Sequence, residues 1–379
     1  MRALLFLLGV LLLIIPEILR VYYIMPFPGS QENVATDLRQ VNIAYWLHGN
    51  IWWVRLIGLA LVAGPAWHYL RHGGWWKRLA VVLPLALAAL VYYAFTFRFM
   101  ADKMFLPPTV KQLATPAVTD STANSLVVVV VREGEARAYP IELIGYHHQV
   151  VDTIGGEAVM ITYCTVCRTG RAFKPQVNGQ PERFRLVGMD HFNAMFEDGR
   201  TGSWWRQVSG ECIAGPLKGQ HLEEVPSTQL TLAEFARLHP QGLVFMPDPN
   251  FTKRYADLKG FDDGTIDSHL EYRDTASWQP KSWVVGVVHN GVARAYDWND
   301  LTRDTLIGDT LGGDSVLLTY GPSPISFAVY RISLLETIED NSSGDVQRLF
   351  EQSTLPAYQE FWHSWRTFHP NTTRYLPEQ

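Results

Sequence analysis

The sequence predicts an α+β protein, in which three N-terminal transmembrane helices precede a β-rich soluble domain built of two diverged tandem repeats. Three observations support this fold class. The first 100 residues contain three long apolar runs, each close to the ~20 residues that a helix needs to cross a bilayer. The chain then changes to short β-branched runs separated by turns. Within that second part, similar segments recur at a constant separation, which indicates an internal duplication.

The composition limits the classes of function. With 379 residues, of which 47% are hydrophobic, the chain is long enough for a membrane part and one sizeable soluble domain. The net charge of -5 gives no sign of a basic surface, so we expect no nucleic-acid partner. Three cysteines are too few for a fold held together by disulfides.

The apolar runs lie at residues 3–23, 51–70 and 79–97. A secretory signal would end in small residues at a cleavage site, whereas the first run continues through Tyr23 with no such site. We therefore expect a retained helix and assign residues 1–100 to a membrane anchor of three helices.

The charges around these runs predict the orientation. A short loop between the second and third runs contains Arg71, Lys77 and Arg78, and loops rich in Lys and Arg stay in the cytoplasm. We therefore expect a bacterial inner-membrane protein with a cytoplasmic N-terminus and a periplasmic soluble domain. Trp52 and Trp53 at the start of the second run, and Trp75 and Trp76 just before the third, fit interfacial aromatic belts.

Three charged residues fall within or near the ends of the runs. Glu17 and Arg20 are three residues apart, so they can pair on one face of the first helix. Arg55 lies one turn inside the second run. We expect these side chains to reach towards the membrane surface. For Arg55, a contact with another helix is the alternative.

Residues 101–122 are rich in Pro, Thr and Ala and predict a linker. After it, two repeats are expected at residues 123–250 and 251–379. Three pairs of similar segments keep a separation of 157 residues: 130–139 with 287–296, 152–156 with 309–313, and 162–163 with 319–320. Each copy begins as a hairpin with Glu-Gly or Asn-Gly at the turn and continues to a buried strand.

A second pair of similar segments, 235–240 and 365–370, is separated by 130 residues. Copy one is therefore longer by 27 residues, the difference between the two separations. Thr231 and Glu234 have the spacing of a capping box and predict a helix start. His239 and His369 each precede a proline, so we expect them at helix ends rather than in a metal site.

Cys164 and Cys167 follow an apolar and β-branched run, residues 158–163, that predicts a buried strand. The Cys-x-x-Cys spacing lets two sulfur atoms bind one metal ion or form a disulfide. The matching positions of the second copy hold Gly321 and Pro324. Glycine and proline indicate a turn rather than an apolar substitute, so we expect a site that belongs to the first copy alone.

The first copy also has a long polar segment after the cysteines. Residues 190–219 mix polar, aromatic and glycine residues with no helix or strand period, so we expect a loop that covers the site. The candidate site residues in it are His191, Asp198, Thr201, Ser203, Trp205 and Cys212. Asp198, Thr201 and Ser203 also fit ordinary turns.

The motifs of this region resemble those of one family. They are Tyr163 with the cysteine pair, Asp198-x-x-Thr201-x-Ser203-x-Trp205-x-Gln207, and then Gly210 and Gly215-Pro216-Leu217-x-Gly219. Over residues 127–247 the chain resembles the bacterial domain-of-unknown-function 3179 (DUF3179) family. The resemblance implies a histidine before the cysteine pair and an aspartate after that histidine, which His148 and Asp152 match. Arg168 departs from the small residue common at its position. The resemblance implies a site and assigns no reaction to it.

Metal binding is the first interpretation of the cysteine pair. Two thiolates, the imidazole of His148 and a further ligand from His191 or Cys212 would form a soft nitrogen and sulfur set, which suits copper or zinc. His147 is adjacent to His148, and adjacent residues of a strand point to opposite faces, so at most one of them is a ligand.

Two other interpretations stay open: thiol–disulfide chemistry, and a purely structural disulfide outside the cytoplasm. Arg168 and Arg171 would favour a thiolate electrostatically. Covalent haem is disfavoured, because haem attachment needs a histidine directly after the second cysteine, where Arg168 stands. The sequence contains no phosphate-binding loop, Ser-His-Asp signature or zinc-protease motif.

The sequence therefore predicts a membrane-anchored, extracytoplasmic metal-binding protein, with redox activity as an extension of that role. It assigns no catalytic residue and no organic cofactor. The alternatives are a thiol–disulfide protein and a non-enzymatic accessory subunit, whose helices and aromatic belts would contact the partner proteins of a larger membrane complex.

Overall fold

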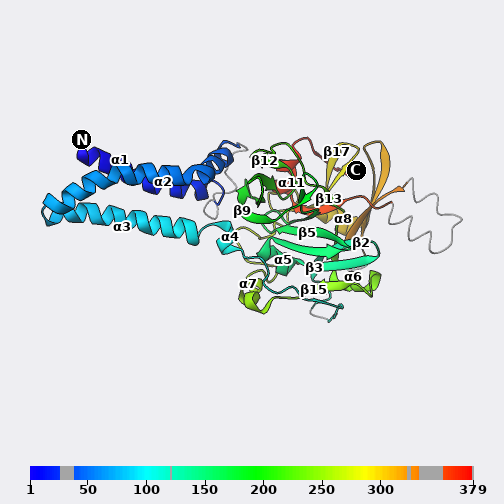
Figure 1. Cartoon of the computed structure of the whole chain (residues 1–379). Helices are drawn as coiled ribbons and strands as arrows, with labels where there is room; N and C mark the ends of the chain where they lie inside the picture. Colours follow the sequence, from blue (N-terminus) through cyan, green and yellow to red (C-terminus); the bar gives the residue numbers. More distant parts are fainter. Residues whose placement is uncertain (26–37, 120–121, 322–325, 333–352, 378–379) are drawn as a thin grey trace. The chain divides into compact units, whose positions relative to one another are not determined.

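The computed structural model describes residues 1–25, 38–119, 122–321, 326–332 and 353–377 (Figure 1). The chain divides into two compact units. The helix unit contains Met1–Leu106, Phe184–Arg206 and Cys212–Gln220, and the β unit contains Pro107–Arg183, Gln207–Glu211 and His221–Gln379. The N-terminal helices therefore share a unit with residues from the middle of the chain.

Three long helices open the helix unit: α1 (Arg2–Tyr22), α2 (Arg39–His72) and α3 (Trp75–Phe97) (Figure 1). As the sequence predicts, all three are long and apolar enough to cross a membrane. The helix α2 begins well before the apolar run at residue 51, because its first turns already bury Val41 and Ala44. A short helix, α4 (Ala101–Met104), stands at the start of the expected linker.

Small residues bring α1 and α2 together. A Cβ atom placed on Gly9 would lie 2.6 Å from Val62 Cγ2 and 2.9 Å from the Gly58 carbonyl oxygen. A Cβ atom on Gly58 would lie 2.9 Å from the side chain of Leu13. Glycines at such contacts let membrane helices approach closely.

The expectation of a loop at residues 190–219 is corrected, because part of this segment forms strands. The strands are β9 (Phe184–Asp190), β10 (Asn193–Asp198), β11 (Trp204–Arg206) and β12 (Cys212–Ala214), in the sheet order β12-β11-β10-β9. Val187, Met195 and Trp204 share one buried cluster with Ile24 and with Val41 of α2. The strand pattern is hidden in the sequence because the strands are short and the turns between them are polar.

The first half of the β unit consists of hairpins and short helices. In chain order, its elements are β1 (Leu113–Ala114), β2 (Leu126–Arg132), β3 (Glu135–Pro140), α5 (Ile141–His147), β4 (Gln149–Ile154), β5 (Glu157–Cys164), β6 (Thr169–Phe173), β7 (Gln176–Val177), β8 (Gln180–Pro181), β13 (Glu224–Val225), β14 (Thr228–Thr231), α6 (Leu232–Leu238) and β15 (Leu243–Phe245). Its two larger sheets have the strand orders β1-β15-β3-β2-β14 and β13-β6-β5-β4.

The second half follows the same plan. After a 3-10 helix (Pro249–Phe251) and α7 (Thr252–Ala256) come β16 (Trp283–His289), β17 (Val292–Asp297), α8 (Trp298–Asp304), β18 (Leu306–Leu311), β19 (Asp314–Tyr320), β20 (Phe327–Arg331), β21 (Ala357–Phe361), α11 (Trp362–Phe368) and β22 (Thr373–Arg374). The sheet orders are β21-β16-β17-β22 and β18-β19-β20.

The two halves agree in strand order, direction and register. The strand β15 runs parallel to β3, and β22 runs parallel to β17. Gln229 of β14 lies opposite Val128, and Gln359 of β21 lies opposite Val285. The separations seen in the sequence thus recur in the pairing, at 157 residues for the two valines and 130 residues for the two glutamines.

The closing helices of the halves begin and end where the sequence predicts. Thr231 accepts a hydrogen bond from the backbone N–H of Glu234 at 3.3 Å and caps α6. His239 and His369 are the residues that directly follow α6 and α11. Both histidines therefore occupy the expected helix ends.

Each half has a core between its first hairpin and its closing helix. Val129 and Phe235 belong to this core in the first half. Gly286 and Trp365 stand at the matching positions of the second half, and a Cβ atom on Gly286 would lie only 2.2 Å from Trp365 Cε3. In the first half, the side chains of Val129 and Phe235 fill this core together. In the second half, Gly286 has no side chain, and the larger ring of Trp365 fills the space.

Candidate functional site

Cys164 and Cys167 lie in the hairpin turn that joins β5 to β6. Cys164 pairs with Thr169 across the hairpin. The turn is closed by a hydrogen bond from Arg168 N–H to the Thr165 carbonyl at 3.1 Å. The two cysteines are buried thiols, with 2% and 0% of their surface exposed. A buried strand ending in the cysteine pair is what the sequence predicts.

The second half has the same hairpin without the thiols. Tyr320 pairs with Phe327, and Gly321 N–H donates to the Ser326 carbonyl at 2.7 Å. A Cβ atom on Gly321 would lie 2.9 Å from Ser326 Cβ, so a cysteine would need a local shift to fit there. Pro324 lies outside the described residues.

Side chains from distant parts of the sequence hold the cysteine turn. Lys281 Nζ donates to the Val166 carbonyl at 3.3 Å, and His363 Nε2 lies 3.1 Å from the same oxygen. A carbonyl only accepts, so we assign a proton to Nε2. Burial, assisted by the charge of Lys281, lowers the pKa of His363 well below its usual value. Neither residue belongs to a sequence motif near the cysteines, which is why sequence patterns do not predict them.

Arg168, the residue after the second cysteine, is 1% exposed and has a left-handed φ of 57°. Its guanidinium donates to Gln359 Oε1 at 3.0 Å and to the Phe261 and Asp262 carbonyls at 2.8 Å each. It also lies 3.7 Å from the centre of the Trp283 ring. Burial lowers the pKa of Arg168 to about 10, so it is a cation at neutral pH.

A second buried arginine forms an ion pair across the two halves. Arg171 Nη2 lies 2.6 Å from Glu360 Oε1, and their side chains are 2% and 0% exposed. Thr169 and Ser364 each donate a hydrogen bond to Glu360 at 2.9 Å. The carboxylate therefore has several donors, which a buried charge needs to offset its lost hydration.

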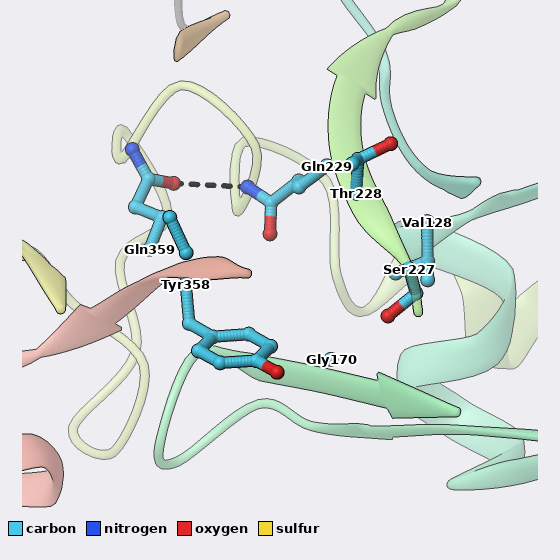
Figure 2. Close-up of a pocket in the computed structure, with 8 residues that line it drawn as sticks. Val128, Gly170, Ser227, Thr228, Gln229, Tyr358 and Gln359 are labelled. Carbon is cyan, nitrogen blue, oxygen red and sulfur yellow. Dashed lines mark hydrogen bonds between the residues drawn. The ribbon is translucent and has the colours of Figure 1, made fainter. Parts of the chain in front are cut away.

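Gln229 and Gln359, which stand 130 residues apart, meet at the junction of the halves (Figure 2). Gln229 Nε2 donates to Gln359 Oε1 at 3.0 Å. The glutamines border a cavity of about 10 Å³, whose other lining residues are Val128, Gly170, Ser227, Thr228, Ala357 and Tyr358. This volume suits about one water molecule, so the cavity is too small for a substrate.

His148 ends α5, with a left-handed φ of 61°, and does not lie on a strand as expected. Its Nδ1 lies 3.1 Å from the Tyr146 carbonyl. Burial lowers the pKa of His148 to about 4, so the imidazole is neutral at pH 7. His147 Nε2 lies 2.8 Å from Tyr255 Oη. Both histidines thus hold the end of this helix in place.

Asp152, which the family resemblance singles out, makes a contact that both halves share. It accepts a hydrogen bond from Tyr139 Oη at 2.7 Å. In the second half, Asp309 accepts one from Tyr296 Oη at 2.8 Å. Because the second half has no cysteine pair, this bond supports the fold rather than a thiol site.

The predicted metal ligands are divided between the units. Cys164, Cys167 and His148 belong to the β unit, whereas His191 and Cys212 belong to the helix unit. His191 Nδ1 lies 2.6 Å from Asp190 Oδ1, and Cys212 Sγ lies 3.4 Å from the Ala214 carbonyl. In the part of the chain that the structure describes, no group of three or more His, Cys, Asp and Glu residues could hold a metal ion.

Asp198 organises the turn between β10 and β11. It accepts hydrogen bonds from Thr201 N–H at 2.6 Å, Thr201 Oγ1 at 2.8 Å, Trp205 Nε1 at 2.9 Å and Ser203 N–H at 3.2 Å. Burial alone would raise the pKa of Asp198, but these hydrogen bonds bring it below its usual value. The Asp-Thr-Ser-Trp motif is therefore a folding motif of the helix unit. Gln207 lies in the β unit and donates to Thr162 Oγ1 at 3.0 Å.

A larger depression, of about 310 Å³, lies between residues 134–137 and 239–243. Its charged side chains, Glu135 and Arg137, pair with each other at 3.0 Å. The depression is lined by neither a cysteine nor an acidic pair, so the cysteine turn remains the better candidate site.

The family described as "Protein of unknown function (DUF3179)" matches residues 107–372. The chain belongs to the DUF3179 family. The match begins at the first residue of the β unit and includes its first half and its second half up to β22. The family therefore extends well beyond the region of motif resemblance. The three candidate membrane helices precede it. No curated protein and no solved structure matches the chain.

Proposed function

We propose that this DUF3179 protein is a membrane-anchored, extracytoplasmic dithiol protein, in which Cys164 and Cys167 form one two-sulfur site for a soft metal ion. The observation that carries this proposal is the hairpin turn that holds both cysteines three residues apart. The Cys-x-x-Cys spacing across a hairpin turn lets two thiolates converge on one ion.

Copper(I) fits this site better than zinc. A closed zinc site takes four protein ligands, and no third His, Cys, Asp or Glu ligand joins the two thiols among the described residues. Thiolates select copper(I), which accepts two-coordinate binding. Lys281 and Arg168 place positive charge beside the turn, which favours thiolates. Both sulfurs are buried, so loading with copper requires the turn to open.

Thiol–disulfide exchange is the second candidate. A disulfide needs Cα atoms about 4.4–6.8 Å apart, a range within reach of two residues three positions apart in one hairpin. In this role the two thiols would lose two protons and two electrons and form a disulfide. The disulfide of a partner protein would take up the two protons and two electrons and be reduced to two thiols.

We also infer that residues 123–250 and 251–379 are copies of one ancestral unit. Their shared register and constant separations support this inference. The extra length of the first copy corresponds to strands β9–β12, which belong to the helix unit. An outward-facing β unit follows from the basic loop between α2 and α3.

The metal proposal is tested with the full chain in detergent, reduced and kept without oxygen, by titration with copper(I) against a coloured chelator. We expect one copper ion per wild-type chain, and none in Cys164→Ser or Cys167→Ser. Cys212→Ser is the matched control, because Cys212 is equally buried but belongs to the helix unit. It should bind copper like the wild type.

Three results would contradict the copper site: no copper in the wild type, equal copper in the double variant Cys164→Ser/Cys167→Ser, or loss of copper in Cys212→Ser. If the wild type binds no copper but takes up two further alkylating groups only after reduction, and the double variant takes up none beyond that of Cys212, the disulfide candidate replaces it. Recovery of stoichiometric membrane partners without either chemistry would favour an accessory subunit.

A further inference from the structure

One carboxylate of the membrane helices is shared by two arginines. Glu17 of α1 accepts hydrogen bonds from Arg20 Nε at 2.9 Å and from Arg55 Nε at 2.5 Å. The side chains of Glu17, Arg20 and Arg55 are 2%, 4% and 11% exposed. The predicted pairing of Glu17 and Arg20 on one helix face is therefore confirmed. Arg55 makes the contact with another helix that was the alternative to reaching for the membrane surface.

The same group also binds the third helix. Arg20 Nη2 donates to the Phe95 carbonyl and to Thr96 Oγ1, each at 3.0 Å, and Arg55 Nη2 donates to Thr96 Oγ1 at 3.3 Å. Since α3 ends at Phe97, the group lies at the end of the bundle from which the chain continues to the β-rich residues. It therefore lies near the level of the lipid headgroups on that side.

The charges of this group do not balance. Among the described residues, Glu17 is the only carboxylate in contact with either guanidinium. Two positive charges and one negative charge leave a surplus of one positive charge. A charge held at membrane depth is costly and is found paired, or in contact with water or headgroups. A negative partner from outside this part of the chain would stabilise the group.

Arg55 is the member that can reach such a partner. Its Nε and Nη2 atoms are bonded, whereas none of the described residues accepts a hydrogen bond from its Nη1. Its guanidinium carbon lies 4.7 Å from the ring centres of both Trp52 and Tyr92. Trp52 is 66% exposed, so this side of Arg55 borders the surface that faces lipid, in an aromatic belt.

We infer that Arg55 binds the phosphate of an anionic phospholipid in the leaflet at this end of the helix bundle. Arginine is well suited to phosphate oxygens because its donors are arranged as a planar fork. Basic pockets between membrane helices bind anionic headgroups in this way. The lipid phosphate supplies the missing negative charge, and its acyl chains lie along the apolar helix surface beside Trp52.

The test is native mass spectrometry of the full chain in neutral detergent, with phosphatidylglycerol or phosphatidylcholine added at equal concentration. We expect the wild type to retain phosphatidylglycerol. Arg55→Gln should retain about fivefold to tenfold less, because it removes the charge and the planar set of donors that hold the phosphate. Arg98→Gln is the control, because it removes an exposed charge at the same end of α3 and should bind like the wild type.

The comparison of the two lipids on the wild type does not depend on whether a variant folds. Equal retention of the two lipids by the wild type would overturn the inference, as would equal binding by Arg55→Gln and the wild type. An equal loss in Arg98→Gln would show a general effect of surface charge and would also overturn it. Inorganic phosphate is added in a separate arm, and displacement of the lipid by phosphate alone would identify a free-anion site instead.

Discussion

Arg168 illustrates what a buried cation beside two thiols requires of its surroundings. Its Nε, Nη1 and Nη2 atoms each find an acceptor, and its planar face lies on the Trp283 ring. Three acceptors and an aromatic face replace the water that an exposed guanidinium would hold. An arginine can therefore stand where a small residue is common, provided that residues far along the chain surround it.

The ion pair between Arg171 and Glu360 should be essential for stability. Glu360→Gln removes the negative charge and leaves Arg171 buried. We expect the free energy of unfolding to fall by about 3–5 kcal/mol, because the buried cation then keeps as a carboxylate partner, among the described residues, only the exposed Glu224, at 3.6 Å. Chemical unfolding of the full chain in detergent, followed by circular dichroism, measures this change.

Glu223→Gln provides the control for that measurement. Glu223 pairs with Lys174 at 2.6 Å, but its side chain is 66% exposed. Exposed pairs contribute about 0–1 kcal/mol, so this variant should remain close to the wild type. Equal losses in the two variants would show that burial of the Arg171–Glu360 pair does not set its importance.

Asp262 should make stability depend on pH. Burial raises the pKa of Asp262 to about 6, from an ordinary value of 3.8. The folded protein thus binds the proton of the Asp262 carboxyl more tightly than the unfolded chain does. This proton binding contributes fully to the free energy of unfolding below about pH 4, and the contribution is lost as the pH rises through about 6. Asp262→Asn stays neutral, so relative to the wild type its melting temperature should rise between pH 4 and 7.

The control for Asp262 is its exposed neighbour, in the variant Asp263→Asn. This variant should follow the pH profile of the wild type. If the melting temperature of Asp262→Asn runs parallel to that of the wild type from pH 4 to 7, the carboxyl of Asp262 does not titrate as proposed.

At the scale of elements, the two closing helices solve one packing problem with different residues. The helix α6 contributes Phe235 against Val129, and α11 contributes Trp365 against Gly286. The strand register is the same in both halves, so the helix and the strand meet at matching positions. A larger helix residue is paired with a smaller strand residue, and the total volume at the contact is kept.

This exchange predicts a compensating pair of substitutions. Gly286→Val alone should lower the free energy of unfolding by about 1–3 kcal/mol or more, because its side chain would overlap the Trp365 ring. Adding Trp365→Phe reproduces the pair found in the first half and should recover most of that loss. Thermal unfolding of the two single variants and the double variant forms the required cycle. Additive losses in the double variant would contradict the shared packing.

Local signals explain which elements are predictable from sequence. The valine-rich strand β2, the Asn-Gly hairpin turn and the Thr231 cap each depend on neighbouring residues, and all stand where the pattern indicates. The strands β9–β12 are short, and their polar residues serve the turns around Asp198. Each strand therefore has too few residues to show a clear alternation of apolar and polar side chains. The apolar residues that these strands contact lie more than a hundred residues earlier.

At the scale of the whole molecule, the positive-inside rule makes a prediction about topology. A reporter enzyme that works only in the periplasm should be active when fused after Phe97 and inactive when fused within the loop at Gly73 and Gly74. A fluorescent reporter that matures only in the cytoplasm should give the reverse pattern. Activity confined to the cytoplasm for the fusion after Phe97 would overturn the outward orientation of the β unit.

The candidate site was only partly predictable, because it is assembled from both halves. A motif identifies Cys164 and Cys167. The side chains that hold their turn, Lys281 and His363, are 115 and 197 residues from Val166. No local pattern connects such residues before the chain folds. For the same reason, the ligand set proposed from sequence includes His191 and Cys212, which belong to the other unit.

The shared helix unit has a consequence for the order of biosynthesis. The three helices are made first and enter the membrane early, yet Ile24 and Val41 gain their partners Val187, Met195 and Trp204 only after those residues have been synthesised. Until then, an apolar surface of the newly made bundle stays uncovered. The protein thus needs either shielding by lipid or a chaperone, or rapid folding of residues 184–220, before the helix unit can reach its final fold.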